Sequence, residues 1–418
     1  MRYFPALLLS LALALTGGLM GPASAERGEP ADPDNPRTWQ TSDQIPGRIA
    51  PDVEVTRALE DTLEREWWYD AAPGVRVAKW VDRGPRGRVR FFVVRTWWDH
   101  KGVSVDYAHP PKVKPTEPLS TMLRRTPDVV AGINGDFFDI GDTGAPLGLG
   151  RARGEGLING IDYGWNSAFW MNRKTGAPQI DLLHMKAVVK GRDLTITNFN
   201  SPQVKPNGIG IYGNRWGGAS GKRWVDGYTR YARAVHVING KVVSNSTELP
   251  WGEFKGYYLV ARGEKQRRQL RRLHIGSEVS TRAWLPESPS MAITGNAILL
   301  KDRKLQVTDD GEMHPRTAVG IDRDKKQVLF IVADGRARLS RGYTMVELAR
   351  LMRHMGAEDA LNLDGGGSST LITRKDGALS VRNVPSDGAE RYIANGLQVT
   401  YTAPPKRGKK GKQGKRDR

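Results

Sequence analysis

One stretch near the C-terminal end of the chain, residues 362–371 (NLDGGGSSTL), combines a carboxylate, three glycines and three hydroxyl groups. Adjacent glycines add no side-chain packing and lose much conformational entropy on folding, so they are kept where the backbone turns sharply or approaches a ligand. Backbone amides freed in such a turn can form an anion-binding nest, to which the hydroxyl groups add donors. A glycine bulge in a sheet is the structural alternative, because no lysine and no helix signal follow as in a Walker loop.

Short apolar runs flank this stretch and recur along the chain, which predicts that strands position the polar residues. The strand-like runs are residues 88–95, 129–133, 187–189, 194–196, 234–238, 297–300, 327–332, 359–363 and 371–373. Helices are predicted over residues 119–125, 263–273 and 344–355. The pattern predicts an α+β fold, with a sheet-rich, mixed β core and a few flanking helices in a single large catalytic domain over residues 57–402.

The helix predicted over residues 344–355 has a recognisable start and end. Thr344 and Glu347 are spaced as a capping-box pair, apolar residues recur at helical intervals, and Gly356 follows the last of them. Glu347 is therefore predicted to cap this helix rather than to act as a catalytic acid.

Three further polar motifs lie where predicted strands begin or end. They are residues 133–139 (INGDFFD), 314–320 (HPRTAVG) and 333–336 (ADGR). Because sheet proteins gather functional side chains at strand ends, we expect these motifs to lie near the glycine run.

The motifs NGDFF, GNAILL, HPRTAVGID, VADGR, LNLDGGGSSTL and RYIANGLQV follow one another in this order. This order resembles the phosphodiester glycosidase family, over about residues 88–401. The resemblance implies hydrolysis of the bond between the anomeric carbon of a sugar and a phosphodiester oxygen, with no cofactor expected. The segment before residue 88, the basic helix around Arg267 and the C-terminal tail lie outside the matching motifs.

The resemblance and the residue types together suggest roles in this chemistry. Asp364 is predicted to be the catalytic carboxylate and Asp136 the second candidate, although the best-known family member has glycine at that place (NGGFF). Arg316 is predicted to hold the phosphate, since a guanidinium matches phosphate oxygens in two directions. The residues predicted to bind substrate are Asn134, Asp334, Gly365, Gly366, Gly367, Ser368, Ser369, Thr370 and His314. A turn aspartate that caps backbone amides is the structural alternative for Asp364, as a loop histidine beside proline is for His314.

A metal site is not expected. The seven histidines lack the paired spacing of a zinc site, and the aspartates at 136, 139 and 142 lack the distal glutamate of a calcium loop. Metal-dependent nuclease chemistry is disfavoured for the same reason. The competing hypothesis for function is a non-catalytic module that binds anionic cell-wall glycans in the same cleft.

The beginning of the chain indicates export. Residues 4–20 are apolar behind Arg2 and end at an A-x-A pattern, which predicts a secretion signal over residues 1–25. A flexible leader is predicted over residues 26–56, and no transmembrane anchor is predicted. We expect a secreted product, stabilised by a packed core because the chain has no cysteine. The twelve tryptophans predict a substantial core or a sugar-facing surface.

Positive charge is concentrated at the C-terminal end. Residues 406–418 hold eight Lys or Arg and one Asp, so they carry +7 of the formal net charge of +19. A Gly/Lys tail over residues 403–418 cannot fold alone, and it is predicted to bind an anionic wall polymer or a membrane surface. A solvated terminus is the alternative. Nucleic acid is not an expected partner of an exported chain.

Overall fold

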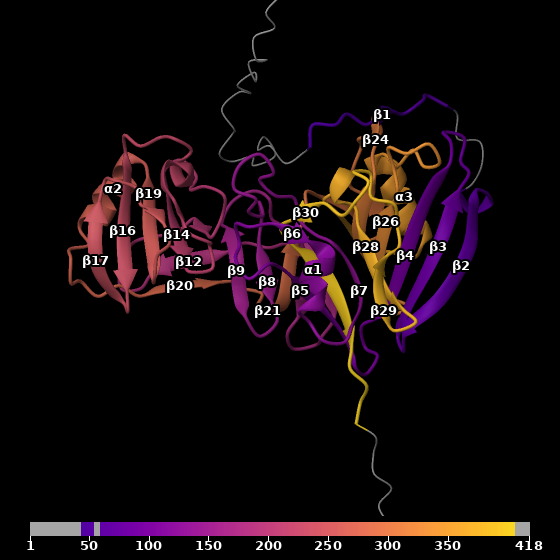
Figure 1. Ribbon diagram of the computed structural model, residues 1–418, viewed down its shortest axis with the longest axis horizontal. Coiled ribbons are helices and arrows are strands. Elements are labelled where there is room, and N and C mark those ends of the chain that lie inside the picture. Colours follow the sequence, from indigo (N-terminus) through magenta and orange to yellow (C-terminus); the bar gives the residue numbers. More distant parts are fainter. Residues whose placement is uncertain (1–42, 54–58, 406–418) are drawn as a thin grey trace, which may run out of the picture.

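The computed structural model describes residues 43–53 and 59–405. The predicted secretion signal, most of the predicted leader and the basic run 406–418 lie outside the described residues. Within them, strands predominate and a few helices flank the sheets, which confirms the sheet-rich α+β fold (Figure 1). The domain boundaries stay a prediction.

Two antiparallel sheets pack face to face in the right-hand half of Figure 1. The first has eight strands in the order β2 (Leu63–Ala72), β3 (Val75–Asp82), β4 (Val89–Trp97), β26 (Gln327–Ala333), β25 (Arg316–Asp322), β27 (Asp359–Leu363), β22 (Ala297–Lys301) and β23 (Lys304–Leu305). The second has five, in the order β29 (Ala378–Val381), β28 (Leu371–Lys375), β7 (Val129–Asn134), β31 (Gly396–Tyr401) and β5 (Val103–Ala108).

Successive side chains of each strand point to opposite faces, so one face of each sheet packs on the other sheet and the opposite face packs on a helix. On β4, Phe92 and Val94 enter the core between the sheets, whereas Phe91 and Val93 pack with the helix α3 (Met345–His354). The helix α1 (Leu119–Arg124) packs on the second sheet through Leu119, Met122 and Leu123. The order of layers is therefore α3, first sheet, second sheet, α1.

A third sheet of ten strands extends the molecule to the left in Figure 1. Its order is β11 (Pro178–Leu182), β10 (Ser167–Asn172), β21 (Pro289–Thr294), β8 (Gly150–Ala152), β9 (Gly156–Ile161), β13 (Asn198–Phe199), β14 (Gly208–Gly213), β19 (Tyr257–Arg262), β16 (Ala232–Ile238) and β17 (Lys241–Ser246). The helix α2 (Glu264–Arg271) packs on its far end through Leu270.

Short strand pairs and 3-10 turns complete the fold. The pairs are β1 (Arg48–Ile49) with β24 (Glu312–Met313), β6 (Glu117–Pro118) with β30 (Tyr392–Ile393), β12 (Lys186–Val189) with β20 (Thr281–Trp284), and β15 (Ala219–Ser220) with β18 (Trp251–Gly252). The 3-10 turns are η2 (Leu59–Asp61), η3 (Gly221–Val225) and η4 (Gly366–Ser368). The β1–β24 pair holds part of the predicted leader against the body of the protein.

The three predicted helices are confirmed as α1, α2 and α3, and most of the predicted strands are present. The strand predicted over residues 194–196 is wrong. Thr195 makes a single bridge to Val188, and the chain then leaves this partner because the Thr197 amide donates to the Ile209 carbonyl. A run this short has no periodicity that separates a strand from a connecting segment.

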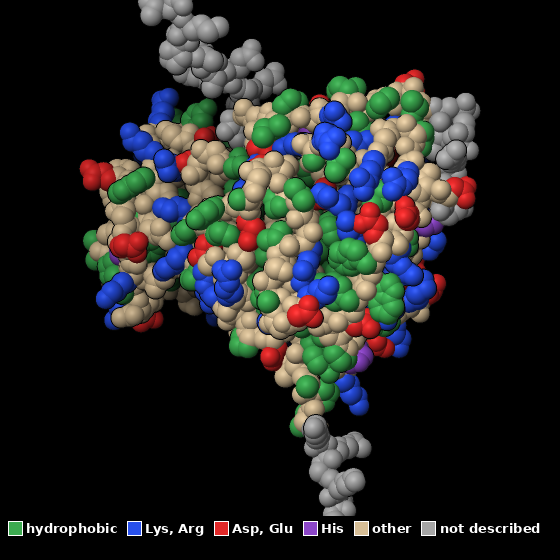
Figure 2. Space-filling model, turned by 45° about the vertical axis from the view of Figure 1, so that its right-hand side comes forward, with side chains coloured by type: hydrophobic (Ala, Val, Ile, Leu, Met, Phe, Trp, Pro, Cys, Tyr) green, Lys and Arg blue, Asp and Glu red, His purple; other side chains and the backbone are tan. Residues whose placement is uncertain are grey.

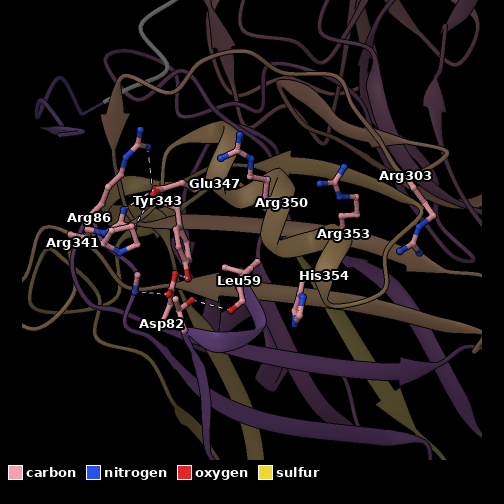
Figure 3. Close-up of a pocket in the computed structure, with 13 residues that line it drawn as sticks. Leu59, Asp82, Arg86, Arg303, Arg341, Tyr343, Glu347, Arg350, Arg353 and His354 are labelled. Carbon is pink, nitrogen blue, oxygen red and sulfur yellow. Dashed lines mark hydrogen bonds and ion pairs between the residues drawn. The ribbon is translucent and has the colours of Figure 1, made fainter. Parts of the chain in front are cut away.

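The predicted cap of α3 is also confirmed. The Thr344 hydroxyl accepts from the Glu347 amide at 3.1 Å, and the Glu347 carboxylate accepts from the Thr344 amide at 3.1 Å. Arg341 donates to both oxygens of the same carboxylate, at 2.7 and 2.9 Å. Glu347 and Arg341 line a pocket of about 570 Å³ beside α3 (Figure 3). Glu347 thus serves as the helix cap and as the ion-pair partner of Arg341.

Replacing Glu347 with alanine is expected to destabilise the fold by about 2–4 kcal/mol, because it removes the cap and leaves the Arg341 charge buried without its partner. Urea unfolding followed by circular dichroism measures this loss. Glu347→Gln, which keeps a capping oxygen, should lose less. Equal stability of wild type and Glu347→Ala would contradict the capping role.

Candidate functional site

The NGD motif lies where the three large sheets meet. Asn134, the last residue of β7, is fully buried and donates from Nδ2 to the Asp364 carbonyl at 2.6 Å. Its Oδ1 accepts from the Thr317 hydroxyl of β25 at 2.7 Å and from the Thr370 amide at 3.1 Å. Asn134 thus ties the second sheet to the first and fixes both ends of the glycine run.

Asp136, two residues later, faces the third sheet. Its Oδ1 accepts from the Phe137 amide and the Trp165 indole, each at 2.8 Å. Its Oδ2 accepts from the Thr294 hydroxyl at 2.6 Å and the Gly148 amide at 3.1 Å. Burial raises the pKa of Asp136 to about 7, against these hydrogen bonds, which lower it. Four donors fix this carboxyl, and its catalytic role stays a prediction.

Asp364 follows β27 and is nearly buried. Its amide donates to the Gly135 carbonyl at 2.9 Å, which places it beside the NGD motif. Burial raises the pKa of its carboxyl to about 7, and the negative charge of Asp136 acts in the same direction, whereas Arg391 lowers it. A carboxyl that titrates near neutral pH is suited to proton transfer.

Two buried polar side chains lie next to this carboxyl. The Ser368 hydroxyl faces the Asp364 carboxyl, and its hydrogen bond lowers the pKa of Asp364. The Asn395 side chain reaches the NGD motif through its Oδ1, which accepts from the Asp136 amide at 2.7 Å, and it also bonds to the Tyr107 hydroxyl. Both side chains therefore belong to the polar surroundings of the two aspartates.

Two of the glycines meet requirements that other residues would not meet, one of backbone angle and one of space. Gly366 has φ of +56°, which favours glycine. A Cβ on Gly367 would lie 2.0 Å from Arg391 Nη2, so only glycine lets this guanidinium reach the turn. Asn383 accepts from the Leu371 amide at 2.8 Å and donates to the Ser369 carbonyl at 2.8 Å, which fixes the end of the run. The run is therefore a built turn rather than a bulge in a sheet.

An anion already occupies the space in front of these glycines. The Asp43 carboxylate accepts from both Nη atoms of Arg336, at 2.8 and 3.2 Å, and from Arg391 Nη2 at 2.7 Å. The Gly367 amide points at the same carboxylate from 3.4 Å. Burial alone would raise the pKa of Asp43, but the bonds from Arg336 and Arg391 outweigh it and hold the pKa well below its ordinary value. We call the two arginines and this amide the anion cradle.

Sequence reasoning missed the anion cradle as a unit. Arg336 and Arg391 each lie in a motif that carries the family resemblance, VADGR and RYIANGLQV, but neither was singled out. Asp43 lies in the predicted flexible leader. A guanidinium within each of two matching motifs was the signal, but the two residues are 55 positions apart in the chain, which hides their proximity.

Arg316 lies at the start of β25, and its guanidinium holds two loops together. Nε donates to the Tyr343 carbonyl at 2.9 Å and Nη2 to the Glu312 carbonyl at 3.2 Å. Burial lowers its pKa to about 10, which leaves it charged at neutral pH. Both of these bonds go to carbonyl groups outside the anion cradle. The role of Arg316 as a phosphate ligand stays a prediction.

His314 and Asp334 also lie at the rim of this region. The His314 ring is 3.0 Å from the Glu312 carboxylate and 3.2 Å from Arg336 Nη2, and burial, followed by the charge of Arg316, lowers its pKa. Asp334 pairs with Arg90 at 2.5 Å and accepts from the Val384 amide at 2.9 Å. Both side chains have partners within the protein. Substrate binding by either stays a prediction.

Among residues 43–53 and 59–405, no group of three or more His, Asp or Glu side chains is arranged to hold a metal ion. No helix in this part of the chain is long and apolar enough to cross a membrane.

The family comparison agrees with the motifs gathered at this site. A model of the phosphodiester glycosidase family matches residues 232–400, which include Asp364, the glycine run and both cradle arginines. The resemblance inferred from the motifs is thereby confirmed.

Two relatives match shorter stretches of the chain. A mouse N-acetylglucosamine-1-phosphodiester alpha-N-acetylglucosaminidase is 43% identical over 75 residues, which are 18% of this chain and 13% of the relative. The Bacillus subtilis prophage-derived protein YomE is 36% identical over 104 residues, 24% of this chain and 15% of the relative. The matched stretches thus span less than a sixth of either relative.

Solved structures share the fold over more of the chain. A hypothetical protein from Synechocystis superposes with a TM-score of 0.66 and 20% identity, over 81% of this chain and 64% of its own. A Burkholderia pseudomallei protein superposes with a TM-score of 0.62 and 21% identity, over 75% of this chain and 74% of its own. At such identities the likeness concerns the fold alone.

Proposed function

We propose that the protein is a hydrolase that cleaves the bond between C1 of a sugar and a phosphodiester oxygen. The observation that carries this proposal is an oxyanion, the Asp43 carboxylate, held by two arginines beside a buried carboxyl, Asp364. The mouse relative acts by its name on an N-acetylglucosamine 1-phosphodiester, which supports a substrate of this class.

In this proposal the phosphate of the substrate replaces the Asp43 carboxylate in the anion cradle. Arg336 offers two parallel donors to it, and Arg391 and the Gly367 amide add one each. Negative charge grows on the phosphate oxygen as the C1–O bond breaks, so these donors stabilise the transition state more than the ground state.

Asp364 supplies the carboxylate of the proposed reaction. A water molecule attacks C1, its proton passes to Asp364, and the electron pair of the C1–O bond leaves with the phosphate. A carboxyl with a pKa of about 7 is a much better base than an ordinary aspartate and remains substantially ionised at neutral pH. The side chains of Ser368 and Asn395, which lie beside the two aspartates, are the proposed contacts of the sugar hydroxyls. Phosphate is a good leaving group, so one carboxylate suffices.

The proposed setting is outside the cytoplasm. The signal-like run at residues 1–25 and the basic run 406–418 support export and retention on an anionic envelope polymer, and the Burkholderia pseudomallei structure is of a candidate exported protein. We propose cell-envelope glycopolymers that contain sugar 1-phosphodiesters as the substrate class.

The test is to incubate the purified protein with a methyl diester of N-acetylglucosamine 1-phosphate and with a panel of other sugar 1-phosphodiesters, and to measure the free sugar released. Hydrolysis of at least one diester supports the proposal. Binding without release, measured by calorimetry, would favour the non-catalytic glycan-binding hypothesis and overturn the enzyme.

Replacing Asp43 with alanine is expected to free the anion cradle. Inorganic phosphate then no longer has to displace the Asp43 carboxylate. Its inhibition constant should fall about tenfold, a change in binding free energy equivalent to one charge-assisted hydrogen bond. Inhibition of sugar release by phosphate measures this effect. Asp52→Ala, in the same segment but exposed, is the control and should match wild type. An unchanged inhibition constant for Asp43→Ala would show that Asp43 and phosphate do not share a site.

A further inference from the structure

We propose that the protein has an extended subsite next to the anion cradle, and that this subsite binds further sugar residues of an anionic glycan. The inference rests on the proposed function and names its substrate as a polymer rather than a single sugar diester. The subsite is a cavity of about 490 Å³ beside the strand β30 and the turn η3, lined by Arg391, Tyr392, Asp142, Lys114 and Arg223 among others. A cavity of this size accommodates a small oligosaccharide.

The cavity begins at the anion cradle. Arg391 binds the Asp43 carboxylate through Nη2 and also lines the cavity, so a ligand anchored on the anion cradle can continue into the cavity. Tyr392, the next residue, is 62% exposed on the short strand β30. Its ring is a solvent-facing apolar surface at the entrance.

A second exposed ring lies next to a residue that lines the cavity. Arg223 of η3 binds Asp142 at 3.0 Å across the cavity, and its guanidinium lies 5.9 Å from the ring centre of Trp251. Trp251 is 71% exposed on β18, which pairs with β15 just before η3. An indole left so exposed costs solvation unless a partner covers it, and its position beside a planar guanidinium suits the face of a sugar ring.

Hydrogen bonds join the segment that carries Lys114 to the segment that precedes β15 and η3. The Val113 amide donates to the Arg215 carbonyl at 2.7 Å, and the Lys114 amide donates to the Trp216 carbonyl at 3.0 Å. Gly217, with φ of +104°, lies so close that a Cβ would sit 3.3 Å from Pro115. The cavity is therefore preformed, and binding does not have to order its walls.

The charged side chains of the cavity favour an anionic glycan. Lys114, Arg223 and Arg391 line it together with Asp142, and Asp387 pairs with Arg391 at 2.7 Å, so one positive charge is in excess once a ligand replaces Asp43. Asp142 can accept from sugar hydroxyls while the cations bind phosphate. Positive side chains are spread over the face of the molecule drawn in Figure 2, and at this cavity they occur together with two exposed rings and the cradle arginine.

The experiment compares an oligomer of four N-acetylglucosamine residues joined by phosphodiesters with the methyl monosaccharide diester. Calorimetric binding is measured on full-length protein carrying Asp364→Asn, with and without Trp251→Ala and Tyr392→Ala. We expect the Kd for the oligomer to rise about tenfold for each substitution, the effect of losing one ring contact. The matched control is Trp68→Ala, which should leave this Kd unchanged. Trp68 lies on β2, is 48% exposed, and has the guanidinium of Arg76 from β3 over its ring.

Each outcome decides the proposal. Equal Kd values for the oligomer with and without the two substitutions overturn the subsite. Tight binding of linear polyphosphate that is unchanged by the two substitutions overturns it as well. Weak binding of the neutral tetra-N-acetylchitotetraose relative to the oligomer supports an anionic ligand, and equal binding overturns that part. If wild type releases no sugar from either diester, the proposed hydrolase fails, but the Kd comparison still tests the subsite.

Discussion

Asp364→Asn is expected to lower kcat for a sugar 1-phosphodiester by about 10³-fold, because an amide cannot take up the proton from the attacking water. The substitution keeps the size of the side chain and its place beside Gly135. Steady-state release of free sugar measures the effect. Wild-type kcat in this variant would remove Asp364 from the mechanism.

The same variant should be more stable than wild type at pH 8. The folded-state pKa of Asp364 is about 7, against an ordinary value of 3.8. Between these two values the unfolded chain loses a proton that the folded protein keeps, so the stability of wild type falls as pH rises through this window. Asparagine avoids that loss, and its Tm at pH 8 should exceed that of wild type.

The control for both effects is Asp376→Asn, the same substitution in the exposed turn between β28 and β29. Asparagine tolerates the left-handed conformation of this residue, whose φ is +51°. Activity and Tm should both match wild type. A gain in stability with a loss of activity only at Asp364 is the signature of a site that keeps an unfavourable charge for function.

Arg336→Gln is expected to raise KM for the same substrate by about 100-fold, since it removes a bidentate, charge-assisted contact with the phosphate. The inhibition constant for inorganic phosphate should rise in parallel, because both ligands use the anion cradle. Initial rates at varied diester and phosphate concentrations give both constants.

Arg338→Gln is the matched control, an exposed arginine two residues away in the same loop. It should leave KM and the phosphate constant unchanged. A fall in kcat with KM and phosphate inhibition intact at Arg336→Gln would contradict a cradle for the phosphate and assign Arg336 to loop structure. Thermal unfolding separates this result from a loss of fold, because Arg336 also donates to the Ile45 carbonyl at 2.7 Å.

Local patterns in the sequence predicted the parts of the fold that depend on neighbours along the chain. The capping pair Thr344 and Glu347 and the apolar stripe behind it defined α3, because a helix makes its hydrogen bonds within one segment. The same holds for most of the strands, whose β-rich composition is local. The single bridge at Thr195 was misjudged, since pairing depends on a partner that the run does not contain.

Motif order also predicted which strand ends would meet. Asn134, Asp364 and the glycine run do lie together, joined by the Asn134 to Asp364 bond of 2.6 Å. Their residue types carry this information, because three glycines and a buried amide have few structural uses outside a tight, fixed turn.

The directions of the long polar side chains followed from packing alone. Arg316, a natural choice for phosphate in the sequence, is turned onto the carbonyls of Glu312 and Tyr343. Arg336 and Arg391 come from separate motifs and converge on Asp43, over 290 residues away. A flexible side chain has many rotamers, and the partners that select one are supplied by distant strands.

The pKa values of the two central aspartates have the same origin. Asp136 and Asp364 have ordinary aspartate chemistry in an extended chain, and burial where the three sheets meet raises both pKa values to about 7. The amino-acid order thus predicted the family resemblance, the strand ends and the glycine turn, all of which are encoded in short segments. The fold established the anion cradle and the acidity of Asp364, because desolvation and charge proximity exist only when distant segments are packed together.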